Sequence, residues 1–480
     1  MATNNIKNRS NSKILTLFFL LLCLIIFITP LPLGSNRVWA WSFEALFATG
    51  LITSMVIFSI FSKSAIGWHR LKYMKLELSL IVFWLLVNML YLIPIPLSIL
   101  AVISPSIAQS YAEVNQSAGY LSLDVYATFE TLMLSLYYFI IFILGIILIN
   151  SRKRIKYVLA IFLTLGVFEA IYGMYLVSIG QTGTLVQVTT VSVFHASGTF
   201  INKNHLVAFL SLCFILGLTL RMILTKDDGD ESYLGLKIRI IKYISRPLRL
   251  LDFSLFLILA GIWNTHSRAG LLSFILALLF LGILVGLIKN IKKVGSKKII
   301  SVLLLSVLLM IVVADDIGYI LETLGARSND SMQYVLNSAQ GRLLAFEQVV
   351  ENFSQYWFTG VGPGAYPVFF VNHRSIDQTA FFDHAHNDYI EFIIEYGVFS
   401  LIILLLMIIF LYRIIKYALK ANHLFYQLLA VGVVSGMIYM LLHGNMDFNA
   451  RIPANIVTII VAISVIYGKI VMSDIKVIKK

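Results

Sequence analysis

Long apolar segments recur along the whole chain and are separated by short polar stretches. Twelve of these segments come close to the length of about 20 residues that a helix needs to cross the hydrocarbon core of a bilayer. Because backbone groups in lipid must hydrogen-bond within their own segment, we expect helices. An alternative for the short seventh and eighth segments is one helical hairpin packed inside the bundle. The predicted spans are residues 14–33, 43–62, 78–102, 127–149, 155–177, 204–224, 251–265, 269–288, 299–315, 396–412, 422–442 and 454–470.

Composition supports a membrane protein. Hydrophobic residues make up 59% of the chain and charged residues 13%, whereas soluble domains average about 45–50% and about 25%. The two cysteines, Cys23 and Cys213, fall inside apolar segments and are expected to be packing residues. No internal repeat is evident, so we expect one all-α integral membrane domain over residues 1–480.

The basic residues predict the orientation of the spans. With the N-terminus in the cytoplasm, only seven of the 37 Lys and Arg residues face outward, which leaves 30 inside. This asymmetry follows the positive-inside rule and explains the net charge of +13 without a nucleic-acid partner. Residues 316–395 then form one large periplasmic loop.

Four outward segments carry most of the unusual polar residues, and we expect them to converge on one face. They are residues 195–205, 265–270, 316–395 and 443–453. Within the large loop, residues 341–353 have helical periodicity, and a glycine-rich turn follows at Gly360–Gly364. From His386 the pattern is helical again and is predicted to continue without a break into the tenth span.

Two outward arginines are candidate anion ligands. Arg268 lies between two spans and Arg342 at the start of the loop helix, and a guanidinium binds phosphate oxygens bidentately. The alternatives are interfacial snorkelling for Arg268 and an ordinary helix-surface charge for Arg342. The turn around Gly362 is either a plain turn or a nest of N–H groups that binds phosphate.

His384, His386 and Asp388 leave three alternatives open. In an extended chain the three side chains would point one way and could hold a metal. In a helix, His384, Asp388, Glu391 and Glu395 would share a face, and a histidine there could act as a general base. The third alternative is capping of the following helix by Asp383 or Asn387.

The last outward segment contains Asp447 and Arg451, spaced so that they could pair with each other on a helix. Lys203, with its neighbours Asn204 and His205, could simply anchor the sixth span at the interface.

Taken in order, these motifs resemble the bacterial O-antigen ligase and O-antigen polymerase superfamily over residues 195–465. The motifs are Ser197–His205, Ser267–Gly270, Gly341–Arg342, Gly360–Gly364, His386–Glu391 with Glu395–Gly397, and Asp447–Pro453.

The resemblance implies a GT-C-like glycosyltransferase of the bacterial inner membrane with its active site facing the periplasm. It would transfer a glycan from undecaprenyl pyrophosphate to a hydroxyl, on lipid A core or on a growing polysaccharide such as O-antigen or exopolysaccharide, without a metal or other cofactor. It implies functional roles for Arg268, Arg342 and His386. We expect substrate contacts from Lys203, Asn204, His384, Asp388, Glu391, Gly362, Asp447 and Arg451.

Partners would be membrane lipid, a flippase or a chain-length regulator. The competing classes are a polytopic secondary transporter and a non-catalytic component of a polysaccharide export complex. A transporter would be expected to carry ionisable residues at mid-membrane and repeated halves.

Overall fold

The computed structural model describes residues 2–62, 66–183, 185, 188–189, 195–225, 248–288, 346–374 and 381–478. Within these ranges the chain is almost entirely helical, and the strands are two short antiparallel pairs. The predicted ninth span, residues 299–315, and Arg342 lie outside the described residues.

The helices follow the apolar segments closely. The first half of the chain forms α1 (Ala2–Ile28), α2 (Val38–Ser62), α3 (Lys75–Leu90), α4 (Leu97–Ile103), α5 (Pro105–Glu113), α6 (Val125–Leu148), α7 (Arg152–Ser178) and α8 (Lys203–Leu224). The second half forms α10 (Arg249–Asn264), α11 (Arg268–Leu287), a helix over 346–356, α14 (Tyr366–His373), α15 (Asp388–Tyr396), α16 (Ser400–Lys420), α17 (Leu424–His443) and α18 (Pro453–Ile478). Short 3₁₀ turns are η1 (Leu33–Ser35), η2 (Trp68–Tyr73), η5 (Gly397–Phe399) and η6 (Asn449–Arg451), and the strands are β1 (Ile95–Pro96), β2 (Ala118–Gly119), β3 (Thr182–Gly183) and β4 (Val188–Thr189).

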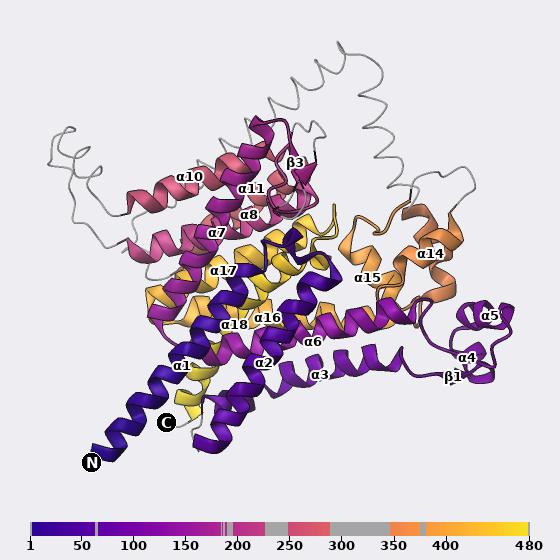
Figure 1. The fold of residues 1–480 in the computed structure, drawn as a ribbon, viewed down its shortest axis with the longest axis horizontal. Coiled ribbons are helices and arrows are strands. Elements are labelled where there is room, and N and C mark those ends of the chain that lie inside the picture. The colour runs from indigo at the N-terminus through magenta and orange to yellow at the C-terminus, as the bar shows by residue number, and fades with distance from the viewer. Residues whose placement is uncertain are drawn as a thin grey trace, which may run out of the picture.

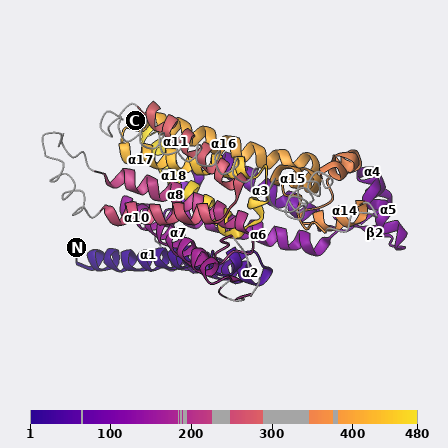
Figure 2. The same cartoon turned by 90° about the horizontal axis from the view of Figure 1, so that it is seen from above.

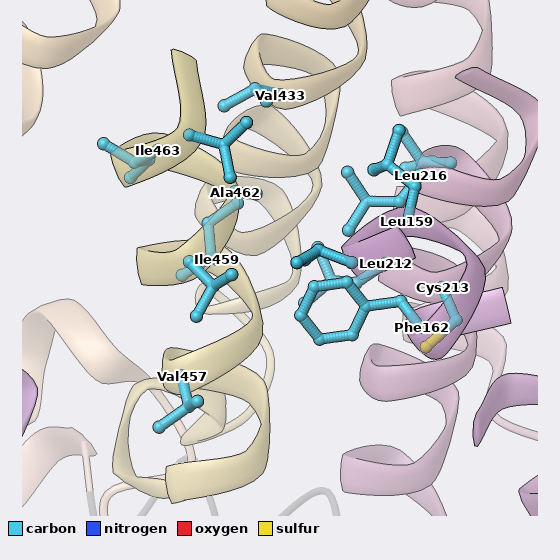
Figure 3. Close-up of a cluster of buried hydrophobic side chains, with 14 of the residues drawn as sticks. Leu159, Phe162, Leu212, Cys213, Leu216, Val433, Val457, Ile459, Ala462 and Ile463 are labelled. Atoms are coloured by element: carbon cyan, nitrogen blue, oxygen red, sulfur yellow. The ribbon is translucent and has the colours of Figure 1, made fainter. Parts of the chain in front are cut away.

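Helices α8 and α17 form the centre of the bundle. Both are buried along most of their length, and α8 packs against α7, α10, α11, α17 and α18. Figure 3 shows the apolar side chains between α7, α8 and α18, including Phe162, Leu212 and Ala462. Cys213 lies in this cluster and Cys23 in the same core, so both are packing residues as predicted. The chain ends N and C lie on the same side of the bundle (Figure 1).

The described helices suit a membrane. Seven of them are long and apolar enough to cross a bilayer: α2, α6, α7, α8, α11, the α15–α16 stretch and α17. Helices α1 and α18 add shorter apolar parts, Ser12–Ile28 and Pro453–Gly468. An all-α membrane protein is therefore the fold, while the count of twelve spans and the GT-C assignment stay predictions.

Three details of the sequence prediction were wrong. The third segment does not continue to residue 102, because α3 ends at Leu90 ahead of Pro94 and Pro96. The helix after His386 is broken at Gly397, whose φ of 52° and ψ of −132° end α15 before α16 begins. The seventh and eighth segments form no packed hairpin, since α10 lies against α7 and α8 whereas α11 lies against α8 and α17.

A small outer subdomain follows α3 and precedes α6. It joins α4 and α5 with the helix 346–356 and α14 through a second apolar cluster, which includes Leu100, Ile107, Val349, Tyr366 and Phe369. Both views place α4, α5 and α14 together beyond the end of the bundle (Figures 1 and 2). The sequence does not predict this subdomain, because apolar residues continue past Leu90 and hide the end of α3.

Buried glutamates connect helices of the bundle, although the spans looked nearly free of charge. Glu44 of α2 accepts hydrogen bonds from Thr29, Ser35 and Tyr137. Glu169 of α7 accepts two from Thr199. Glu77 of α3 pairs with Arg413 and Tyr467. Each carboxylate is thus bound by neighbouring elements and serves as a structural link between them.

The fold allows a direct test of the orientation. In a chain without Cys23 and Cys213, we expect Glu113→Cys, exposed on α5, to react with a membrane-impermeant maleimide once the outer membrane is permeable. The matched variant His69→Cys, exposed in η2 at the other end of the bundle, should react only after the inner membrane is opened. The opposite order of labelling would contradict the predicted orientation.

Candidate active site

The start of α15 is held against the turn between α17 and α18. Asn387 caps α15, since its side chain accepts hydrogen bonds from the N–H groups of Tyr389 and Ile390 at 3.0 and 3.2 Å. This confirms the capping alternative for Asn387. The side chain of Asn387 also donates to the carbonyl of Asn445 at 3.0 Å, and the buried carboxylate of Asp388 accepts from the N–H of Ala450 at 3.1 Å. Asp388 therefore joins two segments.

His386 lies beside Asp447. Its Nδ1 is 3.1 Å from Oδ1 of Asp447, whose side chain is completely buried, while the histidine keeps 18% of its side chain exposed. Burial alone would raise the pKa of Asp447, but the hydrogen bond from His386 and the nearby imidazole of His205 hold it below its usual range. The φ of His386 is +49°, a left-handed conformation that costs a non-glycine residue about 1–2 kcal/mol.

His384 has a different partner. Its Nδ1 is 2.8 Å from Oε1 of Glu391, and its ring stacks on Phe448 with centroids 4.0 Å apart. Phe448 also contacts the edge of His386 at 5.1 Å. The two histidines thus share one aromatic neighbour but pair with different carboxylates.

Arg451 lies between two buried glutamates of α15. Its Nε is 3.0 Å from Oε1 of Glu391, and its Nη2 donates to Glu395. The guanidinium also lies over the ring of Phe392 at 4.6 Å. The alternative that Arg451 pairs with Asp447 was therefore wrong: Arg451 faces α15, and Asp447 faces His386.

The glycine-rich turn is bound to the end of α15. The N–H groups of Val361 and Gly362 donate to the carbonyls of Ile394 and Glu395 at 2.9 and 3.0 Å. At Gly360 an added Cβ would lie 2.2 Å from the carbonyl oxygen of Glu395, so glycine is needed for this close approach. The contacts favour the plain-turn alternative, and Gly362 is buried.

A second group of polar side chains joins the starts of α8 and α11. Ser267 caps α11 and donates from Oγ to Oδ1 of Asn204 at 2.7 Å. Lys203 donates from Nζ to the carbonyl of His266 at 3.4 Å. Arg268 is exposed at the first position of α11, and no hydrogen bond or ion pair engages it within the part of the chain described. Burial, with smaller contributions from Lys203 and His266, lowers the pKa of His195 to about 4.

His205 connects the two groups. Its buried ring meets Phe448 edge-on with centroids 4.6 Å apart, and its carbonyl accepts a hydrogen bond from Asn455 at 3.3 Å. Residues 195–205, 265–270, 384–391 and 443–453 therefore form one continuous cluster at one end of the helices. The predicted convergence of the outward segments is confirmed for the described residues; Arg342 lies outside them.

Phe448 is the central residue that the sequence did not reveal, and His205 had been considered only as a neighbour of Lys203 at the interface. Phe448 directly follows Asp447 in a motif that had been singled out, but a phenylalanine carries no chemical signal by itself. The metal alternative requires the side chains of His384, His386 and Asp388 to point toward one shared site. They do not, because each of the three has a different partner. No cluster of possible metal ligands occurs among the residues with described positions.

Comparison with known proteins gives one family. Residues 253–405 match the model of the O-antigen ligase family, and no curated protein matches the chain. The match confirms the resemblance to the O-antigen ligase and polymerase superfamily over this stretch. Together with the apolar helices, the match indicates a multi-pass membrane protein with a stretch similar to the O-antigen ligase family.

Arg451 should be critical for stability. We expect Arg451→Met to cost about 3–5 kcal/mol, because Glu391 and Glu395 would stay buried without their cation. Thermal unfolding of the purified protein would measure the loss. Arg221→Met is the comparison, since the Arg221–Asp252 pair is partly exposed and should be worth less. Equal, small losses in both variants would show that the buried pairing is unimportant.

Proposed function

We propose that this chain is an inner-membrane glycosyltransferase that transfers a glycan from undecaprenyl pyrophosphate to a hydroxyl acceptor on the periplasmic side. The acceptor would be lipid A core, a growing O-antigen or an exopolysaccharide. The observation that carries the proposal is that the His386–Asp447 pair is linked, through Phe448 and His205, to the starts of α8 and α11, which carry Lys203 and Arg268. The family match over residues 253–405 supports the same class of reaction.

His386 would be the general base. With Nδ1–H donated to Asp447, the accessible Nε2 is free to accept the proton of the acceptor hydroxyl. Asp447 would hold this tautomer and stabilise the imidazolium that forms, as the carboxylate does in other histidine–carboxylate pairs. The oxygen of the acceptor would then attack the anomeric carbon, and the bond to the pyrophosphate would break. One displacement of this kind inverts the anomeric centre.

Cations would match the charge that develops on the leaving pyrophosphate. Arg268 and Lys203 stand at the starts of α11 and α8, and these two helix starts are joined by the contact of Lys203 with the carbonyl of His266 and by the Ser267–Asn204 hydrogen bond. Arg342, which lies outside the described residues, would add a second guanidinium. Fixed cations aimed at a leaving group lower the barrier because they need no reorganisation during the reaction.

Products from a defined donor would test the proposal. The purified protein would be incubated with a lipid-linked repeat unit alone, with lipid A core, or with an acceptor protein. Longer lipid-linked chains would mean a polymerase, transfer to lipid A core a ligase, and transfer to protein an oligosaccharyltransferase. If no covalent product forms while the glycolipid is moved or retained, a transporter or a non-catalytic component is the better assignment.

Arg268 should be needed for turnover. We expect Arg268→Ala to lose most activity and Arg268→Lys to remain impaired, because an ammonium group cannot reproduce the bidentate fork. The matched control is Arg374→Ala, which removes an exposed arginine of the large loop. Transfer rates at equal membrane abundance would be compared. Wild-type rates for both Arg268 variants would refute this role.

His386 and Asp447 should act together. General-base assistance is worth about 10²–10⁴-fold in rate, so we expect His386→Ala to lose activity on that scale while the protein still inserts. Asp447→Asn should lose much of the same rate because the imidazole loses its orienting carboxylate. In the double variant the losses should not add. Fully additive losses, measured as transfer rates, would mean that the two residues act independently.

A further inference from the structure

The second histidine of the outer turn has an environment that His386 does not share. His384 lies two residues before His386, yet it pairs with Glu391 at 2.8 Å and stacks flat on Phe448. Its side chain keeps 24% exposure. Its Nε2 has no hydrogen-bond partner within the described part of the chain and is not among the fully buried polar atoms. One ring nitrogen is thus fixed and the other is accessible.

The charges around Glu391 favour a protonated His384. Glu391 and Glu395 are both buried, and Arg451 supplies one positive charge to the two carboxylates. A protonated imidazole of His384, which contacts Glu391, would make this cluster neutral. Buried charges are tolerated mainly when they are paired. The N–H of Ala385 also donates to Glu391 at 2.9 Å, which fixes the carboxylate in place.

We propose that His384 is a cationic ligand of the donor's pyrophosphate, which offers its Nε2–H to a phosphate oxygen while His386 serves as the base. This inference rests on the function proposed above. Because His384 and His386 lie against the same ring of Phe448, a cation at His384 stands next to the proton-accepting site without competing for Asp447. Glu391 is then a positioning residue that acts through His384.

The surroundings of His384 set the expected pH dependence. The charged or titratable groups near it are Asp383 in its own segment, Glu391 of α15, Arg451 of η6 and His205 of α8, with His386 and Asp447 across Phe448. Burial works against the charged imidazole, but the charge and hydrogen bond of Glu391 outweigh it and raise the pKa of His384 above its ordinary value. Donor binding should therefore be strong below that raised pKa and should weaken as the pH rises through it.

Binding of undecaprenyl pyrophosphate to the full-length protein in phosphatidylcholine nanodiscs tests the proposal. His384→Gln keeps a polar side chain but removes the cation, and we expect it to weaken binding about tenfold or more, as for a lost charged hydrogen bond. In transfer assays KM for the donor should rise more than kcat falls. The affinity of His384→Gln should also depend less on pH than that of the wild type. The pyrophosphate titrates in the same way with both proteins, so the difference between them reports on His384.

His373→Gln is the matched control. His373 lies on α14 of the same large loop and also stacks on a phenylalanine, Phe369, with centroids 4.5 Å apart. It should leave the donor affinity unchanged. Size-exclusion chromatography and thermal unfolding would verify that both variants fold, and the pH dependence in the wild type gives a test that needs no variant.

The outcomes separate this inference from the proposed function. If the wild type does not bind undecaprenyl pyrophosphate, the proposed function fails. If the wild type binds but His384→Gln binds equally well with the same pH dependence, the role of His384 is wrong and the function stands. If His384→Gln instead weakens the binding of phosphatidylglycerol as strongly as the binding of undecaprenyl pyrophosphate, His384 binds a lipid headgroup. The assignment to the donor is then overturned.

Discussion

The outer site depends on burying charges only where they have partners. Arg451 contacts two glutamates on successive turns of α15, and this pairing fixes α15 against the turn between α17 and α18. Asn387 and Asp388 also bind the start of α15 to residues 444–450. Together these contacts place His386 next to Asp447. An unpaired charge at this depth would be costly. The geometry of the proposed base therefore follows from an ion pair one helical turn away.

The rest of the site is built from helix ends. Helices α8 and α17 pack together at the centre of the bundle, so the start of α8 and the end of α17 meet at one face. His205 lies near the start of α8 and Asp447 in the turn that follows α17, and Ser267 connects the start of α11 to α8. Functional side chains on the ends of rigid helices keep fixed positions, while the helices themselves satisfy the demands of the membrane. The polar cluster and the membrane-spanning segments thus occupy different parts of the same elements.

Much of the fold could be predicted because apolar length is a strong signal for a helix in a membrane. The described helices fall on eleven of the twelve predicted segments. The errors arose where local backbone chemistry outweighed hydrophobicity. Pro94 and Pro96 follow the end of α3, and the left-handed Gly397 ends α15, although the apolar residues continue past both points.

The sequence predicted which segments form the candidate site better than it predicted which side chains pair with each other. Convergence of the outward segments followed from the count of spans, and it was confirmed for the described residues. The partners could not be read from spacing: Asp447 and Arg451 are four residues apart, yet one faces His386 and the other faces α15. Such choices depend on how distant helices meet, and a single sequence does not record that. Phe448 was missed for the same reason, since its importance lies in the three histidine rings around it.

Two histidines separated by one residue would normally be expected to share an environment. Here the left-handed backbone at His386 and the ring of Phe448 separate them, so that each meets a different carboxylate. Those carboxylates also differ in their further contacts. Asp447 accepts from its neighbouring N–H at Phe448, while Glu391 shares Arg451 with Glu395. A general base must lose and regain a proton in each cycle, whereas an anion ligand must keep its proton. Separate carboxylate partners are the physical means by which one short turn can provide both.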